Sequence, residues 1–161
     1  GTYSVTVIDT ASRACASPAT SVTLDSNATP CGPNVAVGAQ SLPSSIAEGG
    51  TATINYFVSN VGTGPTSGTI TVLIGKPANG TLTLNLPTGW TILSQSPGSV
   101  FIQTTNVIIP GLINRVTIPA TYVHDGTNED AVKTTDITAA PGSGSEVITN
   151  DNTGSTFIQI N

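Results

Sequence analysis

The sequence predicts an all-β protein, an immunoglobulin-like antiparallel β-sandwich with an additional N-terminal strand. The first observation behind this prediction is segment 46–74, in which two stretches of alternating polar and apolar residues flank a turn-rich connector. Ile54, Tyr56 and Val58 occupy alternate positions of the first stretch, so they would lie on one face of a strand. Val72 belongs to the same alternation in the second stretch. A period of two in β-branched and aromatic residues, interrupted by Gly, Pro and Asn, is typical of antiparallel strands.

The second observation is the number of short strand signals along the chain. Turns rich in Gly, Pro and Asn, such as GTGPTSG, SPGS and HDGTNED, separate them. The expected strands lie near residues 2–8, 20–24, 35–40, 51–60, 67–75, 81–86, 90–94, 99–103, 105–109, 115–123, 131–139 and 155–160. Many short strands with frequent turns favour a sandwich. The long polar connectors 125–130 and 141–154 suit the ends of a sandwich better than they suit a barrel.

Composition is the third observation. Charged residues make up only 8% of the chain, and the formal net charge is −5. The few Lys and Arg residues are scattered singly, whereas nucleic-acid binding needs clustered basic residues, so no nucleic-acid partner is expected. No run of about 18 apolar residues is present, so membrane insertion is not expected either. A neutral surface rich in Thr and Ser favours an extracellular β protein.

The pattern divides the chain into an N-terminal strand with a linker, residues 1–34, and a complete sandwich, residues 35–161. Cys15 and Cys31 lie in the first part, and in an oxidising compartment we expect a disulfide between them. Closing a loop of about 15 residues would stabilise the fold by roughly 3 kcal/mol. Two free buried thiols are the alternative.

The N-terminal strand has two interpretations. Tyr3, Val5 and Val7 would form one face of a strand near residues 2–8. This strand is either the first strand of its own sheet or a strand donated to a partner. In the second case its backbone would pair with an open sheet edge, and its alternating side chains would fill pockets in the partner.

One loop carries candidate metal ligands. Asp125, Asn128 and Asp130 place carboxylate and amide oxygens close together, and Ca²⁺ binds such ligands. The oxygen-rich stretch 150–152 could lie at the same end of the sandwich. The spacing does not match a 12-residue EF-hand loop, and Asp, Asn and Gly also serve turns for backbone reasons. Both calcium and simple turns therefore stay open.

No catalytic residue is expected. The sequence has no G-x-S-x-G motif, and His124 is interpreted as an exposed last residue of a strand. Trp90, the single tryptophan, is expected in the core, although an exposed Trp could stack on a sugar ring.

Two stretches resemble known bacterial surface repeats. GTYSVTVIDTASRACAS, at the start of the chain, resembles the closing strand of repeats in gliding-type and surface adhesins of Bacteroidetes. The region 41–160 resembles immunoglobulin-like repeat domains of the DUF11 and CARDB kind. The motifs that carry this second resemblance are EGGTATINYFVSNVGTGPTSGTITV at 48–72, PTGW at 87–90, IIPG at 108–111 and NDNTGSTFIQI at 150–160.

The resemblance implies a non-enzymatic structural or adhesive module of a bacterial cell surface. Such a module would self-associate into a polymer, as a filament subunit joined by strand donation, or stand in tandem repeats. A calcium-dependent module that binds a glycan or host ligand is one alternative. An accessory domain of a secreted enzyme is another.

Overall fold

The computed structural model describes residues 2–5, 20–23 and 32–161 of the chain. It consists of two compact units, 1–30 and 31–161. The sequence-based boundary lay a few residues later, after residue 34.

The first unit contains a small sheet of its own. Strand β1 (Thr2–Val5) pairs antiparallel with β2 (Thr20–Thr23), and Tyr3 stands opposite Val22. Within the described residues, β1 is therefore one half of a hairpin-like pair rather than a lone strand. The predicted disulfide between Cys15 and Cys31, and Val7 of the predicted partner strand, lie outside the described residues.

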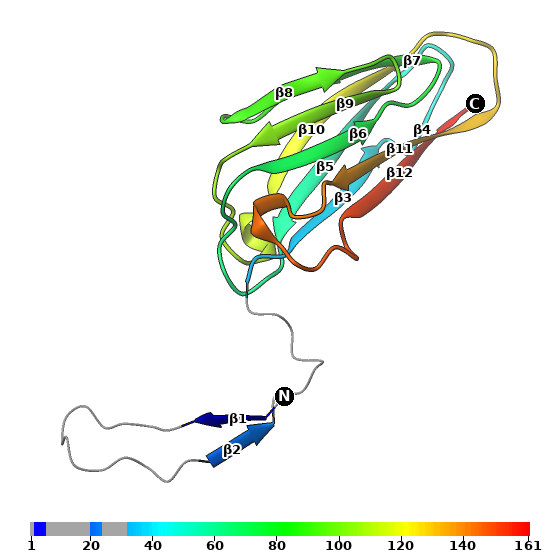
Figure 1. Ribbon diagram of the computed structural model, residues 1–161. Helices are drawn as coiled ribbons and strands as arrows, with labels where there is room; N and C mark the ends of the chain where they lie inside the picture. The colour runs from blue at the N-terminus through cyan, green and yellow to red at the C-terminus, as the bar shows by residue number, and fades with distance from the viewer. Residues whose placement is uncertain (1, 6–19, 24–31) are drawn as a thin grey trace. The chain divides into compact units, whose positions relative to one another are not determined.

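The second unit is a sandwich of two sheets (Figure 1). The four-stranded sheet has the order β3-β5-β10-β7, and all its neighbours are antiparallel. Its strands are β3 (Val35–Leu42), β5 (Thr51–Asn60), β10 (Val116–His124) and β7 (Gly80–Leu84).

The second sheet has six strands in the order β4-β12-β11-β6-β9-β8. The strands are β4 (Ser45–Ile46), β12 (Thr153–Ile160), β11 (Ala131–Ala139), β6 (Ile70–Gly75), β9 (Ser99–Thr104) and β8 (Trp90–Gln95). The β4–β12 pair is parallel, and the other pairs are antiparallel. Two short 3₁₀ helices, η1 (Leu112–Asn114) and η2 (Ser143–Ser145), lie in connections. The predicted all-β sandwich is thus confirmed.

The core lies between the sheets and follows the alternation in the sequence. Ile54, Tyr56 and Val58 of β5 are buried, and they face buried isoleucines and valines of β6 and β9. Removing these apolar side chains from water is the main favourable contribution to folding. Trp90 is also buried, as expected.

Within residues 32–161, one predicted strand is absent and one strand was not predicted. Residues 105–109 form an extended loop, because the backbone of Ile108 bonds to Thr66 and Asn60 instead of to a neighbouring strand. The donor–acceptor distances of these bonds are 2.8–3.1 Å. Strand β4 was not predicted, because two residues are too few to show an alternating pattern. No helix in the described part of the chain is long and apolar enough to cross a membrane.

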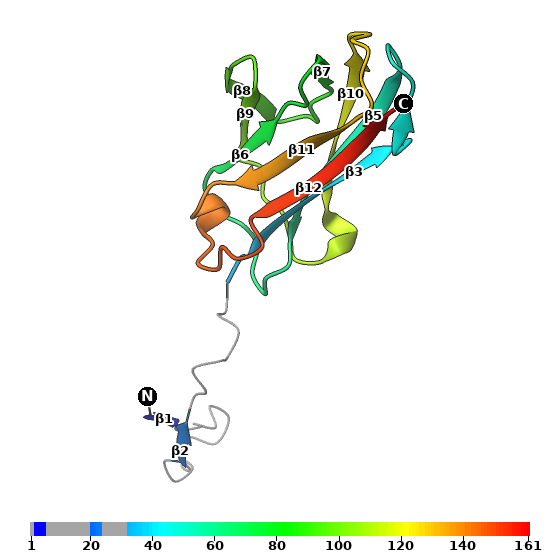
Figure 2. The same ribbon diagram turned by 90° about the vertical axis from the view of Figure 1, so that its right-hand side faces the viewer.

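One side of the sandwich is closed by direct contact between β3 and β12, which run side by side (Figure 2). Gly38 and Gly154 let the two backbones approach: a Cβ atom on Gly154 would lie 2.7 Å from Gly38 Cα. Farther along, the Ser41 hydroxyl donates to the carbonyl of Phe157 at 2.6 Å. The chain also crosses here from one sheet to the other, because β3 belongs to the first and β4 to the second.

Candidate functional site

The opposite side of the sandwich is open. The four-stranded sheet ends at β7, whereas the six-stranded sheet continues to β9 and β8. Ile92 of β8 pairs with Ile102 of β9, yet Ile92 is 51% exposed and Ile102 is 0% exposed. The inner face of the larger sheet is therefore left uncovered at its last strand.

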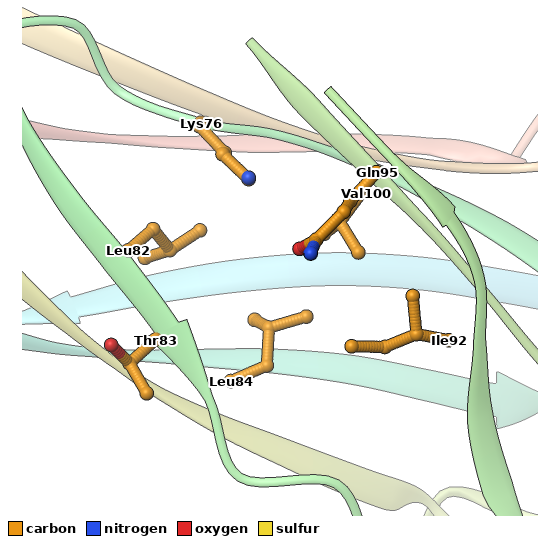
Figure 3. Close-up of a pocket in the computed structure, with 7 residues that line it drawn as sticks. All are labelled: Lys76, Leu82, Thr83, Leu84, Ile92, Gln95 and Val100. Atoms are coloured by element: carbon orange, nitrogen blue, oxygen red, sulfur yellow. The ribbon is translucent and has the colours of Figure 1, made fainter. Parts of the chain in front are cut away.

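A groove of about 200 Å³ follows from this mismatch, and we call it the edge groove. It is lined by Lys76, Leu82, Thr83, Leu84, Ile92, Gln95 and Val100 (Figure 3). Leu82 and Leu84 come from β7 and pack against the core while staying partly exposed. The centre of the edge groove is apolar, and its polar side chains lie around it.

The size and chemistry of the edge groove favour apolar side chains over a small molecule. Pockets for small molecules usually enclose about 300–1,000 Å³, which exceeds this groove. Its lining contains no carboxylate, imidazole or thiol. Its one charged group, the Lys76 ammonium, donates to the Ser96 carbonyl at 2.8 Å. The groove therefore offers shape and apolar surface rather than acid–base chemistry.

Two open strand edges flank the edge groove. Strand β8 is interrupted by a bulge between Ile92 and Ser94, and bulges obstruct the addition of a further strand. Strand β7 pairs with β10 in continuous register from Gly80 to Leu84. Because β7 is the last strand of its sheet, its other edge is a regular template for strand addition.

The predicted calcium ligands lie on the loop between β10 and β11, where Asp125 makes a turn contact and Asp130 bonds to β12. Asp125 Oδ1 accepts from the backbone N–H of Thr127 at 2.9 Å, and hydrogen bonds from Thr127 lower the pKa of Asp125. Asp130 Oδ1 accepts from Gln159 Nε2 at 2.9 Å, and Asn128 is exposed. Across residues 2–5, 20–23 and 32–161, no three His, Cys, Asp or Glu side chains are arranged to hold a metal.

The interpretation of His124 as an exposed residue was wrong. It is the last residue of β10, but it is only 2% exposed. Its Nδ1 accepts from the backbone N–H groups of Gly49 and Gly126 at 3.2 Å, so Nε2 carries the proton and donates to Glu129 Oε1 at 2.8 Å. Glu129 also pairs with Lys133, and chiefly for this reason its pKa is lowered. His124 is therefore enclosed by two loops, and the backbone N–H groups of both loops donate to its Nδ1.

A second polar cluster lies at the other end of the sandwich. Glu146 accepts from the backbone N–H of Val35 at 2.8 Å and from Asn152 Nδ2 at 2.6 Å. Asp151 accepts from Asn34 Nδ2 at 3.0 Å. Burial raises the pKa of Glu146, although hydrogen bonds oppose this shift. We call Asn34, Glu146, Asp151 and Asn152 the oxygen cluster.

The oxygen cluster was not predicted as one site. The sequence left open that the stretch 150–152 lies near the loop 125–130. The length of β11 separates them, since Ala131 pairs with Ile160 and Thr138 with Thr153. The other two members of the oxygen cluster, Asn34 and Glu146, belong to no sequence motif that would connect them to Asp151.

These features define a β-sandwich of immunoglobulin-like architecture with one closed and one open side. No family model and no curated protein matches the sequence. Among solved structures, it is similar to a CARDB domain from Pyrococcus furiosus in complex with di-metal ions. The TM-score is 0.54 at 12% identity, over 87% of this chain and 100% of that one.

A chain of the CaDoc0917–CaCohA2 complex is similar to the same degree, with a TM-score of 0.54 and 12% identity. That match covers 80% of this chain and 100% of the other. A weaker match, with a TM-score of 0.46 and 13% identity, is AvmM, which catalyzes macrocyclization in alchivemycin A biosynthesis. At such identities the likeness concerns the fold alone, and a CARDB domain is among the chains that share this β-sandwich fold.

Proposed function

We propose that this protein is a non-enzymatic structural module of a bacterial cell surface and that it joins a second copy by strand addition at the edge groove. In this proposal, the N-terminal strand of one copy pairs with β7 of the next. Tyr3, Val5 and Val7 of the incoming strand would supply the alternating face that enters the groove.

The uncovered inner face beside β7 is the observation that carries the proposal. A strand added to β7 would extend the four-stranded sheet to five strands and cover Ile92. Full burial of an isoleucine is worth about 1.5–3 kcal/mol, so covering this half-exposed side chain contributes roughly 1 kcal/mol. Main-chain hydrogen bonds to β7 would add affinity, and the groove would select the side chains.

The small sheet of the first unit also supports the N-terminal strand as the strand that is added to β7. A two-stranded sheet is marginally stable on its own in water, and a third strand improves it. Of the described strands, β1 pairs with β2 alone. Its second edge can therefore pair with an open strand elsewhere, and β7 offers such an edge.

Two other features favour a binding module over an enzyme. The edge groove contains no carboxylate or imidazole for general acid–base catalysis, and its one lysine, Lys76, donates to the Ser96 carbonyl. A neighbour of the same fold is part of a protein complex, the CaDoc0917–CaCohA2 complex. We extend to this chain only the idea that such a sandwich serves protein association.

The experiment compares two arginine substitutions at apolar side chains of similar exposure. Ile92→Arg places a charge in the edge groove, whereas Val132→Arg places one on the outward face of β11, where Val132 is 56% exposed. Analytical ultracentrifugation of the full chain measures assembly. We expect Ile92→Arg to weaken self-association at least tenfold and Val132→Arg to leave it unchanged.

Deletion of residues 1–14 tests the donated strand separately. The deleted protein should keep the β-sheet circular dichroism of the parent and lose assembly. A parent that stays monomeric at every concentration, or assembly that survives the deletion, would rule out strand donation.

Calcium at Asp125, Asn128 and Asp130 remains a separate proposal for the loop between β10 and β11. A neighbour of the same fold was solved with di-metal ions, and this motivates a test here. Asp125→Ala combined with Asp130→Ala should lower the melting temperature only when calcium is supplied. An equal effect with and without calcium would leave the turn contacts as the role of these side chains.

A further inference from the structure

Three buried oxygens without a hydrogen-bond donor all belong to the oxygen cluster. Across residues 2–5, 20–23 and 32–161, the buried side-chain atoms that lack a partner are Asn34 Oδ1, Asp151 Oδ1 and Asn152 Oδ1. Asn152 is itself only 4% exposed. A buried acceptor left without a donor destabilises the fold, because it has lost its hydrogen bonds to water without replacement. Asn34 bonds to Asp151, and Asn152 bonds to Glu146. Glu146 also accepts from the N–H of Val35, so the three acceptors lie in one connected group that lacks a donor.

The orientation of both amides is determined by their neighbours. Asn152 Nδ2 donates to Glu146 Oε1 at 2.6 Å and to the Ala139 carbonyl at 3.3 Å. Asn34 Nδ2 donates to Asp151 Oδ2 at 3.0 Å. Turning either amide over would bring oxygen against oxygen. The atoms left over are therefore oxygens, and they need a donor or a cation.

No basic side chain of the described residues compensates the two carboxylates of the oxygen cluster. Lys76 donates to the Ser96 carbonyl, and Lys133 pairs with Glu129 at the other end of β11. The guanidinium of Arg115 lies over the ring of Phe57, 4.3 Å from its centre. Glu146 and Asp151 thus bring negative charge into a partly buried site.

We propose that Asn34, Glu146, Asp151 and Asn152 form a site for a divalent hard cation, with Ca²⁺ as the ion that fits best. Ca²⁺ takes six to eight oxygens from carboxylates, amides, backbone carbonyls and water. The oxygen cluster supplies two carboxylates and two amide oxygens, and water would complete the shell. This site is distinct from the loop that carries Asp125 and is independent of strand addition at the edge groove.

An ion bound at the oxygen cluster would connect two strands of the sandwich. Asn34 directly precedes β3, whereas Asp151 and Asn152 directly precede β12 (Figure 1). An ion held by both would fasten the entry of the chain into the sandwich to its last strand. Calcium should therefore increase the stability of the sandwich as it binds.

The test is a calcium titration of the full chain after treatment with a chelator. Calorimetry should show a calcium site that Asp151→Asn removes. At about 10 mM CaCl₂, a site of the affinity usual in extracellular modules should raise the melting temperature by roughly 5–10 °C. Mg²⁺ at the same concentration should have a smaller effect, because it releases its water reluctantly.

Asp151→Asn keeps an oxygen that can accept from Asn34, so it is expected to fold. Without calcium it should melt no lower than the parent, because the substitution removes an uncompensated charge. Glu146→Gln provides a second variant that should also abolish the calcium response.

The matched control is Asp136→Asn, which changes an exposed carboxylate on β11 that belongs to neither candidate calcium site. It should keep the full calcium response. The proposal is wrong if the parent neither binds calcium nor gains stability from it, or if Asp151→Asn responds as the parent does. Loss of the whole response in the Asp125→Ala, Asp130→Ala variant, with Asp151→Asn responding as the parent does, would place the ion on the other loop and also overturn the proposal.

Discussion

At the scale of single residues, the hydroxyl of Tyr56 joins the two sheets through the core. It donates to Thr135 Oγ1, which in turn donates to the carbonyl of Gly75. Tyr56 belongs to β5 of the smaller sheet, whereas Thr135 and Gly75 belong to β11 and β6 of the larger one. This chain of bonds satisfies two buried hydroxyls and fixes the two sheets against each other.

Tyr56→Phe should lower the free energy of unfolding by about 1–2 kcal/mol, because the substitution removes one bond and leaves Thr135 without its donor. Urea unfolding measures the change. Adding Thr135→Val should cost less than the sum of the two single substitutions, since both partners are then gone. Strictly additive effects would show that the two hydroxyls are not coupled.

The same tyrosine makes stability sensitive to alkali. Burial raises the pKa of Tyr56 from 10.0 to about 12. The folded state therefore favours the neutral phenol, and this contribution is fully present below pH 10 and lost as the pH rises through about 12. The free energy of unfolding should fall over that range. The decline should be shallower in Tyr56→Phe, and an identical decline in both proteins would assign it to other groups.

The burial of Trp90 could be predicted from the sequence, whereas the burial of His124 could not. The tryptophan was correctly expected in the core, because a large aromatic within an apolar strand is usually buried. The burial of His124 could not be predicted, since its partners include the backbone of Gly49, 75 residues earlier in the chain. A polar residue is buried when distant donors meet it, and this meeting is a property of the fold.

At the scale of elements, the strands followed from the alternation of residues, and their exceptions have physical reasons. Residues 105–109 had the composition of a strand, but Thr66 and Asn60 take up the backbone groups of Ile108. Strand β6 begins at Ile70, three residues later than expected. The connection before it bonds to η2, with the N–H of Ser67 donating to the carbonyl of Gly144.

The backbones of β3 and β12 approach each other closely at Gly154, and this contact makes a clear prediction. Gly154→Ala would place Cβ 2.7 Å from Gly38 Cα and 2.9 Å from the Val37 carbonyl oxygen. Because backbone atoms cannot move aside cheaply, we expect a loss of about 1–3 kcal/mol. Gly98→Ala is the control, since no atom lies within 4 Å of its new Cβ. Thermal unfolding that ranks the two variants equally would contradict this account of the contact.

At the scale of the whole molecule, the sandwich is asymmetric between its two sides. The side of β3 and β12 is closed by glycines, hydroxyl bonds and the crossover of the chain, whereas the side of β7 and β8 leaves the edge groove. The sequence could predict the class of fold and most of the core. It could not predict the groove, because the groove depends on which sheet has more strands and where each one ends. The sequence could not predict the oxygen cluster either, because only the fold brings Asn34 together with Glu146 and Asp151.

The arrangement of β3 and β12 has a mechanical consequence. Ser41 lies beside Phe157, and the N–H of Val37 donates to the carbonyl of Asp151, so β3 and β12 run in the same direction. Tension applied at Val35 and Ile160 would therefore draw them past each other lengthwise. Their contacts would be loaded together rather than opened one after another, as in peeling. Forced unfolding is governed by the unfolding rate, and this geometry slows that rate under load.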